Sequence, residues 1–223
     1  MPGNGTKRVA FVTVGQSPRE DILTEMLPLL GPGVEVMEVG ALDGMRRDEI
    51  AQLAPVGDER RLCTRLRDGA EVVTTKAWTR DRLQHVMDNL DADGVDLIVL
   101  LCTGYFDGLG SRTLMVEAQR VVDHMVSALA EGDRRVGVMV PLEAQTREFA
   151  QKGVGPVPAR VTHASPYSEN RLAEAAVELA DSDFIVMHCM GYSEAMRQEV
   201  AEVSGRPVLL ARRIVADAVA QLL

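Results

Sequence analysis

Short runs of apolar residues alternate along the chain with longer segments in which apolar residues recur every three or four positions. Continuous apolar runs are typical of strands buried on both faces of a parallel sheet, whereas the second pattern is typical of amphipathic helices. The runs predict seven strands, at residues 9–14, 34–39, 95–102, 136–140, 160–164, 184–189 and 207–211. The amphipathic segments predict helices at residues 18–30, 80–90, 111–130, 168–180, 192–204 and 214–223. Strands that alternate with helices predict βαβ units and an α/β fold.

An internal repeat is the most informative feature of this pattern. The segments 96–105 and 183–192 are identical at six of ten positions, at an offset of 87 residues, and a weaker match relates residues 7–12 to residues 134–139. The alternative explanation is chance similarity between two buried strands that end in Cys-x-Gly. The ordered pairing of a second strand pair argues against chance. The repeat therefore predicts two pseudo-symmetric lobes, each an open parallel sheet of the Rossmann-like or flavodoxin-like kind.

The chain from residue 60 to residue 76 departs from the alternation of strands and helices. Residues 61–66 and 71–75 resemble two strands, and Asp68-Gly69 between them supplies the positive φ that tight hairpin turns require. We expect a β-hairpin inserted in the first lobe at about residues 60–76. The lobes are expected to comprise residues 1–112 with 206–223, and residues 113–205.

The composition is that of a globular protein with an acidic surface. Lys and Arg number 24 and Asp and Glu number 33, and the net charge of −9 argues against a surface for nucleic acid or an acidic membrane. No apolar run approaches the roughly 18 residues of a membrane span, and the first residues show no secretory signal. The three cysteines are an odd number without close spacing, which favours free thiols in a reducing compartment. We therefore expect a cytoplasmic protein.

Candidate chemistry lies at the carboxyl ends of the predicted strands, where open parallel sheets bind their ligands. Cys102 and Cys189 occupy equivalent ends of the repeated strands, each before a glycine-containing turn. A thiol near a helix N-terminus is acidified and becomes a usable base or nucleophile, although either cysteine alone could be a small buried apolar residue. Two thiols that flank one cleft can remove a proton from one face of a carbon and return one to the other face, without a cofactor.

Residues near these strand ends are candidates for binding a substrate carboxylate. Ser17, Pro18 and Glu20 predict a capping box at the start of a helix, where free N–H groups together with Gln16 and Arg19 can hold an anion. Helix initiation alone is the alternative role of this segment. The further candidates are Thr103, Gly104, Gln145, Gly191, Tyr192 and Ser193.

The remaining motifs indicate neither a metal site nor a nucleotide cofactor. The sequence contains no CxxC, HExxH, GxGxxG or P-loop pattern, so we expect no metal and no cofactor. His188 directly precedes Cys189, so in a strand its side chain points to the opposite face of the sheet, and we expect it to be structural. Cys63 in the hairpin is also expected to be structural.

The segments around these candidates resemble the AroM family. The resemblance rests on VTVGQSPREDI at residues 12–22, GALDGM at 40–45, LLCTGYF at 100–106 and HCMGYS at 188–193. The AroM family is in turn similar to the aspartate/glutamate/hydantoin racemase superfamily, whose relatives include maleate cis–trans isomerase and arylmalonate decarboxylase. The resemblance implies two pseudo-symmetric α/β lobes, no cofactor, and one cysteine from each lobe on either side of the substrate.

Position by position, the resemblance implies that Cys102 and Cys189 are the paired cysteines. Gln16 and Ser17 fall where the superfamily often has Asp-Ser, and Met190 departs from the Thr that commonly follows the second cysteine. These departures weaken the case for the standard amino-acid substrates.

The sequence thus predicts a cofactor-independent racemase or isomerase that acts on a small carboxylic acid through two opposed cysteines in an interlobe cleft. The alternative is a non-catalytic protein that binds or senses a small carboxylate, with a link to aromatic amino-acid (shikimate) metabolism implied by the family's name. A third option is an interaction module with a vestigial cleft. The acidic, aromatic-poor composition gives this option little support, because protein interfaces are enriched in aromatic residues. We expect a small carboxylate as the partner, no nucleic acid and no membrane, and we leave a homodimer open.

Overall fold

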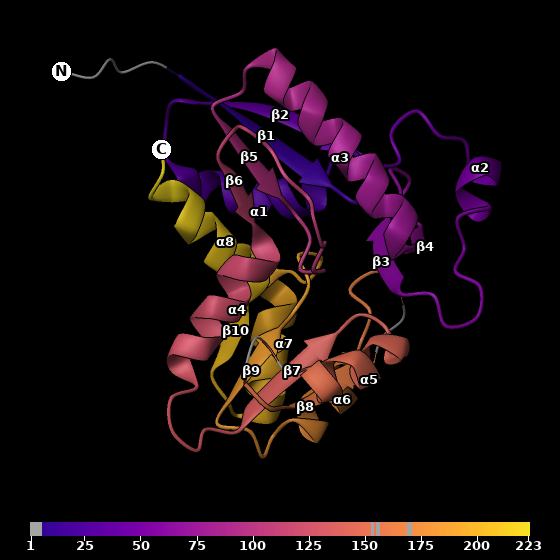
Figure 1. The fold of residues 1–223 in the computed structure, drawn as a ribbon. Helices are drawn as coiled ribbons and strands as arrows, with labels where there is room; N and C mark the ends of the chain where they lie inside the picture. The colour runs from indigo at the N-terminus through magenta and orange to yellow at the C-terminus, as the bar shows by residue number, and fades with distance from the viewer. Residues whose placement is uncertain (1–5, 153, 155–156, 169–170) are drawn as a thin grey trace.

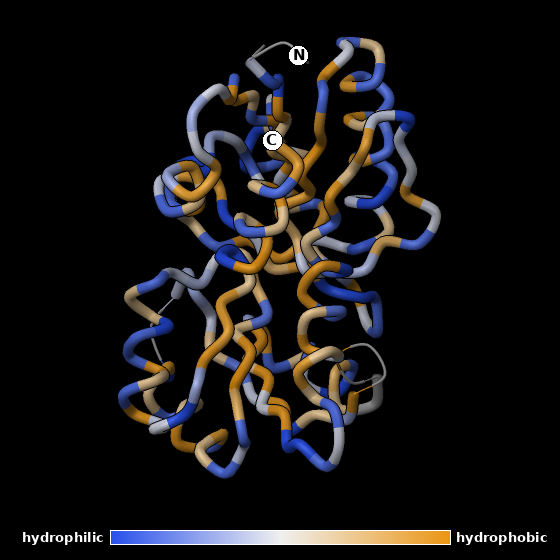
Figure 2. The backbone as a smooth tube through the Cα atoms, turned by 90° about the vertical axis from the view of Figure 1, so that its left-hand side faces the viewer, coloured by the Kyte–Doolittle hydropathy of each residue, from blue (hydrophilic) through white to orange (hydrophobic). Residues whose placement is uncertain are grey.

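Two parallel four-stranded sheets, each with flanking helices, make up the protein (Figure 1). The computed structural model describes residues 6–152, 154, 157–168 and 171–223. Strand segments are the most apolar parts of the tube in Figure 2, and the helices around them alternate between polar and apolar residues. This is the arrangement that continuous apolar runs predict for buried parallel strands, and the predicted α/β class with two parallel sheets is confirmed.

The first sheet has the strand order β2-β1-β5-β6. Its strands are β1 (Lys7–Thr13), β2 (Val34–Gly40), β5 (Leu97–Leu100) and β6 (Met115–Glu117). Its helices are α1 (Glu20–Leu30) and α3 (Lys76–Asp93), and α4 (Ala118–Leu129) follows β6 directly. All three strand pairs are parallel.

The second sheet repeats this order as β8-β7-β9-β10. Its strands are β7 (Val136–Val140), β8 (Ala159–His163), β9 (Phe184–Met187) and β10 (Val208–Leu210). Its helices are α5 (Glu143–Lys152), α6 (Leu172–Glu178) and α7 (Glu194–Ser204), and α8 (Ala211–Ala220) follows β10 directly. In both sheets the first strand lies between the second and the third, so the two halves share one topology.

The repeat extends to individual hydrogen bonds at the start of the strands. The amide of Arg8 donates to the carboxylate of Asp96 at 2.8 Å, and the amide of Asp96 donates to the carbonyl of Arg8 at 2.9 Å. Arg135 and Asp183 form the same reciprocal pair, with both distances 2.8 Å. These are the residues that the sequence repeat aligns, so the similarity reflects a shared local structure.

The predicted hairpin is present as β3 (Arg61–Arg65) and β4 (Glu71–Thr75), which pair in antiparallel register. Gly69 lies in its turn with φ +91°, a conformation that favours glycine. A short helix, α2 (Arg47–Ala51), packs beside the hairpin. In Figure 1 the hairpin lies below α3 on the side of the first lobe that faces the second, and α2 lies on the outer side of the hairpin.

Sheet pairing places two strands differently from the predicted lobe ranges. Residues 115–117 fall in the range expected for the second lobe, but β6 pairs with β5 of the first sheet. Residues 208–210 fall in the range expected for the first lobe, but β10 pairs with β9 of the second sheet. The chain therefore crosses between the lobes after the fourth strand of each sheet, through α4 and α8.

Several helices also begin at residues other than those predicted from the sequence. The helix expected at 111–130 begins only at Ala118, because its first turn is replaced by β6, a three-residue strand too short to show a period of two. α3 begins four residues earlier than expected, and α2 and α5 were not predicted. Residues 169 and 170 of the helix expected at 168–180 lie outside the described residues, as do residues 1–5 of the first lobe.

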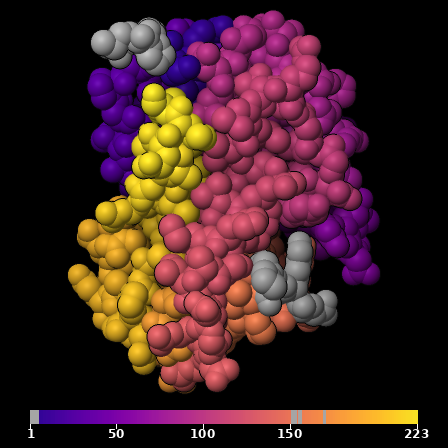
Figure 3. Space-filling model, turned by 60° about the vertical axis from the view of Figure 1, so that its left-hand side comes forward, coloured from indigo at the N-terminus to yellow at the C-terminus, as the bar shows by residue number. Residues whose placement is uncertain are grey.

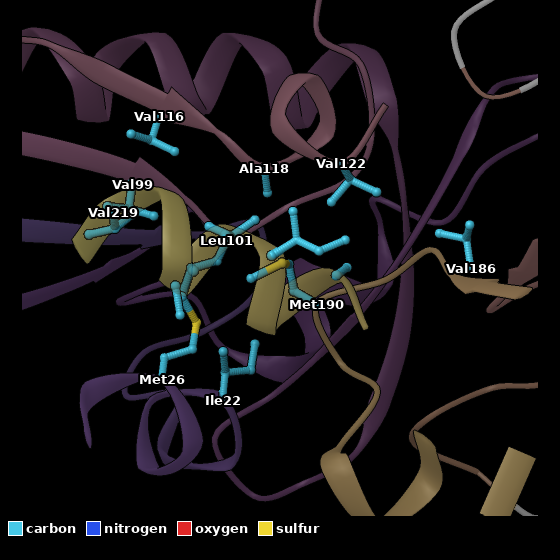
Figure 4. Close-up of a cluster of buried hydrophobic side chains, with 14 of the residues drawn as sticks. Ile22, Met26, Val99, Leu101, Val116, Ala118, Val122, Val186, Met190 and Val219 are labelled. Carbon is cyan, nitrogen blue, oxygen red and sulfur yellow. The ribbon is translucent and has the colours of Figure 1, made fainter. Parts of the chain in front are cut away.

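One apolar core extends through both lobes. Buried side chains of the first sheet and α1, such as Val99 and Met26, belong to the same cluster as Val186 of the second sheet (Figure 4). Val122 of α4 and Val219 of α8 lie in this cluster as well. The two helices pack against each other, and they lie side by side across both lobes in Figure 3. Because close-packed cores resist deformation, this shared core fixes how the lobes face each other.

Candidate active site

The two repeated cysteines occupy equivalent turns. The sequence predicts each cysteine on the last residue of its strand. Instead, β5 ends at Leu100 and β9 ends at Met187, so each cysteine lies two residues beyond its strand. The sulfur of Cys102 accepts a hydrogen bond from the amide of Gly104 at 3.3 Å, and the sulfur of Cys189 accepts one from the amide of Gly191 at 3.4 Å. Each sulfur thus has the same backbone donor two residues along the chain.

The two cysteine turns meet between the lobes. The hydroxyl of Thr103 donates to the carbonyl of His188 at 3.0 Å, which joins the residues next to the two cysteines. Cys102 and Cys189 both line one cavity of about 70 Å³, well below the roughly 300 Å³ at which typical ligand pockets begin. The cavity is therefore small in this conformation.

Burial raises the pKa of Cys102 to about 12, against the acidification that the sequence predicts. Burial likewise raises the pKa of Cys189, while the amide of Gly191 and the charge of Arg19 oppose the increase. No helix N-terminus lies close enough to lower the pKa of either thiol. α7 begins five residues after Cys189, and no described helix begins between Cys102 and α4. The field of a helix terminus falls off within its first turn.

Arg19 joins the two lobes inside the cavity wall. Its side chain is buried and binds both carboxylate oxygens of Asp21 at 2.9 and 2.8 Å. It also donates to the hydroxyl of Thr13 at 3.1 Å and to the hydroxyl of Tyr167 in the second lobe at 3.1 Å. Burial alone would raise the pKa of Asp21, but the hydrogen bonds and charge of Arg19 outweigh it and lower that pKa.

Tyr167 connects this arginine to the second cysteine. Its ring lies below the Arg19 guanidinium at 5.6 Å, and its hydroxyl lowers the pKa of Cys189 through a hydrogen bond. Burial raises the pKa of the Tyr167 phenol well above its ordinary value, so the group stays neutral. A Cβ atom at Gly191 would lie 2.3 Å from the Tyr167 hydroxyl oxygen, so the close approach requires glycine there.

The predicted capping box is absent. α1 begins at Glu20 with Arg19 as its N-cap, and no side chain caps it. Ser17 instead binds Asp43, with its hydroxyl on one carboxylate oxygen at 2.6 Å and its amide on the other at 2.8 Å. Gln16 bonds to backbone atoms of neighbouring loops, including the carbonyl of Leu42 at 3.4 Å. Gln16 and Ser17 hold loops together and do not line the cavity.

The other binding candidates divide in the same way. Thr103, Gly104 and Gln145 line the cavity, as does Arg19. The lining does not include Gly191, Tyr192 or Ser193. The buried Tyr192 hydroxyl donates to the carbonyl of Ala164 at 2.5 Å, and Ser193 caps α7 by accepting from the amide of Met196 at 3.2 Å. The amides of Gly104 and Gly191, expected to bind a carboxylate, bind the sulfur atoms instead.

Several cavity residues were not predicted from the sequence. Lys76 at the start of α3, Gln119 and Asp123 of α4, and Tyr167 all line the cavity. Cys63 and His188, expected to be structural, line it too. The position of His188 beside a repeated cysteine was the one signal available in the sequence. The others come from segments far apart in the chain, which only the fold brings together.

Neither a metal centre nor a membrane span is seen in the part of the chain that the structure describes. Its His, Cys, Asp and Glu side chains form no group of three or more that could hold a metal ion. None of its helices is both long and apolar enough to cross a membrane.

Solved structures with this fold include racemases and isomerases. Glutamate racemase from Thermus thermophilus is similar with a TM-score of 0.64 and 16% identity, over 98% of this chain and 80% of that one. Allantoin racemase from Klebsiella pneumoniae is similar with a TM-score of 0.60 and 16% identity, over 97% and 87%. Maleate cis–trans isomerase from Nocardia farcinica is similar with a TM-score of 0.59 and 16% identity, over 96% and 91%. At these identities the likeness shows the fold.

Family membership rests on sequence. No curated protein sequence matches the chain significantly. A family model described as AroM protein matches residues 9–223, which includes both cysteine turns and both sheets. The chain therefore belongs to the AroM family.

Proposed function

We propose that the protein is a cofactor-independent racemase or isomerase that acts on a small carboxylic acid, with Cys102 and Cys189 as its two acid/base groups. The observation that supports this most is the equivalent placement of the two sulfurs. Each sulfur accepts a hydrogen bond from a glycine amide, at 3.3 Å for Cys102 and 3.4 Å for Cys189, and both cysteines line one cavity. Thr103 and His188 hold the two turns in contact.

The proposed reaction is a proton transfer through the plane of a carbanion. One cysteine, as thiolate, removes the proton from the carbon next to the carboxylate, and the electron pair moves into the carboxylate as an enediolate. The other cysteine, as thiol, gives its proton to the opposite face. The product has the inverted centre, and the two sulfurs have exchanged their protonation states, so the reverse reaction uses the same groups in exchanged roles.

Charges around the cavity suit this reaction. The backbone amides of Gly104 and Gly191 stabilise whichever sulfur is the thiolate, because hydrogen bonds to an ion are stronger than those to a neutral group. Lys76 and Arg19 line the cavity and supply the positive charge that a carboxylate and its enediolate need. Their charges lower the pKa of Cys102 against the larger effect of burial.

Deuterium exchange tests the proposal. The wild-type protein is incubated with a panel of small carboxylic acids in deuterated water, and deuterium at the carbon next to the carboxylate is measured by NMR. The proposal expects enzyme-dependent exchange with at least one acid. The variant Cys63→Ser should keep the exchange, because Cys63 has no equivalent turn in the other lobe. Exchange with none of the acids would overturn the proposed reaction.

A nucleophilic role for one cysteine is a variant of the same proposal. A structure of Nocardia farcinica maleate cis–trans isomerase, similar in fold with 17% identity, contains a covalently bound succinylcysteine intermediate. If the same chemistry operates here, one sulfur adds to the substrate and later leaves. Mass spectrometry of the protein quenched during turnover then detects an adduct that either Cys102→Ser or Cys189→Ser abolishes.

The second candidate function is binding or sensing of a small carboxylate without turnover. The raised pKa of both thiols favours it, because few thiolates exist at neutral pH in the ligand-free protein. This candidate expects saturable binding by calorimetry in the absence of any deuterium exchange. The link to aromatic amino-acid (shikimate) metabolism, a cytoplasmic location and a homodimer belong to the proposal and rest on the sequence.

A further inference from the structure

Three polar side chains form a connected group in the cavity wall, and the reaction proposed above uses none of them. The Nε2 atom of His188 lies 2.9 Å from one carboxylate oxygen of Asp123. The amide nitrogen of Gln119 donates to the other oxygen of Asp123. All three residues line the cavity that contains Cys102 and Cys189.

The bonding pattern assigns the protons that face Asp123. A carboxylate accepts only, so His188 presents Nε2–H and Gln119 presents its amide N–H₂ to Asp123. In the neutral imidazole this leaves Nδ1 of His188 as an acceptor, and Oε1 of Gln119 is an acceptor as well. Both oxygens of Asp123 are occupied.

The two acceptors are buried and unpaired. Among the described residues, Nδ1 of His188 and Oε1 of Gln119 have no hydrogen-bond partner. His188 is 2% exposed, and its ring packs edge-on against Phe149 with the centroids 4.8 Å apart. Buried polar groups in folded proteins are nearly always paired with protein, water or ligand atoms, so unpaired acceptors that line a cavity are groups that a ligand entering it can pair with.

The charges of the cavity divide in a way that fixes the ligand's chemistry. The cations Arg19, Arg61 and Lys76 come from the first lobe, as does the unpaired hydroxyl of Thr64. The unpaired acceptors of Gln119 and His188 come from α4 and the turn after β9. Because both oxygens of Asp123 are engaged, this group offers an imidazole nitrogen and an amide oxygen, and the other carboxylate of the cavity, Glu148 of α5, lies outside it. Uncharged hydrogen-bond donors on the ligand fit these two acceptors best.

We propose that Gln119, Asp123 and His188 form a subsite that binds a hydroxyl or amide N–H of the ligand. The ligand is then a carboxylic acid with at least one such donor, and not a plain mono- or dicarboxylate. The inference rests on the proposed function only in placing the carboxylate in the same cavity. Asp123 acts here as a positioning residue, since it orients the two side chains and does not itself face the donor.

Matched pairs of acids test the subsite. Calorimetry with the whole protein compares malate with succinate and lactate with propionate, each up to about 10 mM, because millimolar affinity is the weakest that a specific small-molecule site usually shows. The wild type should bind the hydroxy acid of a pair about tenfold more tightly, since a site that bonds a hydroxyl rejects the analogue that lacks it. Equal affinity within both pairs, or binding of none of the four acids, would overturn the proposal.

Variants assign the preference to these residues. His188→Phe keeps a ring packed against Phe149 and removes the Nδ1 acceptor, so the preference should fall to about threefold or less. Gln119→Met removes the second acceptor and should act in the same direction. His124→Phe, at the exposed position that follows Asp123 on α4, is the matched control and should keep the preference.

The outcomes separate this subsite from the proposed reaction. A preference that persists in His188→Phe and Gln119→Met overturns the subsite even if deuterium exchange is observed. A preference that these variants remove, without exchange in any acid, supports the subsite and removes the catalytic proposal. Thermal unfolding of each variant identifies one that fails to fold, and the other variant then decides.

Discussion

At the scale of single residues, Arg212 of α8 determines where the second cysteine turn lies. Its side chain is 2% exposed and donates to the carbonyl of Met190 at 2.9 and 3.1 Å and to that of Gly191 at 2.9 Å. It also reaches α1 of the first lobe, where it donates to the carbonyl of Asp21 at 2.8 Å and pairs with Glu25 at 2.9 Å. One guanidinium thus connects the Cys189 turn to the opposite lobe.

The variant Arg212→Met should lower the free energy of unfolding by about 2–4 kcal/mol, because it leaves the buried carbonyls of Met190 and Gly191 without their donor, and an unpaired buried acceptor costs about 1–3 kcal/mol. The neighbouring Arg213 is exposed and lies 3.9 Å from Glu194. Arg213→Met should therefore change stability by no more than about 0.5 kcal/mol. Urea unfolding of both variants measures the difference, and equal losses would contradict the role of Arg212.

Gly191→Ala tests the contact between the second cysteine turn and Tyr167. The added Cβ would lie 2.3 Å from the Tyr167 hydroxyl oxygen and 2.8 Å from Pro166, so Tyr167 must move away from Arg19. We expect a loss of about 1–3 kcal/mol, as for other overpacked sites. Gly110→Ala is the matched control, because a Cβ there meets nothing within 4 Å. Similar melting temperatures for the two variants would show that Tyr167 is not held as described.

The raised thiol pKa values predict slow alkylation of the ligand-free protein. With the pKa of Cys102 at about 12, its thiolate fraction near pH 8 is far below that of an ordinary cysteine. Iodoacetamide should modify Cys102 at least about tenfold more slowly in the folded protein than in urea, since only the thiolate reacts. Mass spectrometry of the modified peptide measures this, and equal rates would contradict the burial effect.

The same shift predicts a dependence of stability on alkaline pH. The folded state binds the Cys102 proton more tightly than the unfolded chain, so the thiol stabilises the fold fully below its ordinary pKa of 9.0. That contribution is lost as the pH rises from about 9 to about 12. Cys102→Ser should reduce the slope of unfolding free energy against pH in this range.

The residues predicted from sequence and those that were missed differ in how local their signal is. Cys102 and Cys189 were predictable because a ten-residue repeat marks both turns. Arg212 was not, because its partner carbonyl at Asp21 is 191 residues away in the chain. Ser17 matched a helix-capping pattern, but its hydroxyl donates to the carboxylate of Asp43 and does not cap α1.

At the scale of elements, the hairpin β3–β4 closes one side of the cavity. Cys63 and Thr64 of β3 line it, and Glu71 of β4 accepts a hydrogen bond from Ser165 of the second lobe. The hairpin was predictable from Asp68-Gly69, since that pair has a specific turn geometry. Its contact with Ser165 was not, because the two residues are 94 positions apart in the chain.

Ser165→Ala should loosen the hairpin without unfolding the protein. The lost hydrogen bond is worth about 1 kcal/mol, which should raise the hydrogen-exchange rate of amides in residues 61–75 several-fold. Ser168→Ala removes an exposed hydroxyl nearby and should leave those rates unchanged. If Ser165→Ala also leaves the exchange rates of these amides unchanged, Ser165 does not restrain the hairpin.

At the scale of the whole molecule, two sheets with one strand order face each other through a shared core. Their cysteine turns are in contact through Thr103 and His188, and α4 and α8 join the lobes on one side. The two parallel sheets were predictable from the alternation of patterns and the repeat. The sheets in which β6 and β10 pair were not predictable, because these strands have only three residues each.

The central claim is that one ligand lies between the two sulfurs, and deuterium exchange from separate enantiomers tests it most directly. For an acid that the wild type exchanges from both enantiomers, Cys102→Ser should abolish exchange from one enantiomer and keep it from the other. Cys189→Ser should do the opposite, because each sulfur reaches one face of the carbon. Loss from both enantiomers in only one variant, with the other variant unaffected, would contradict the account.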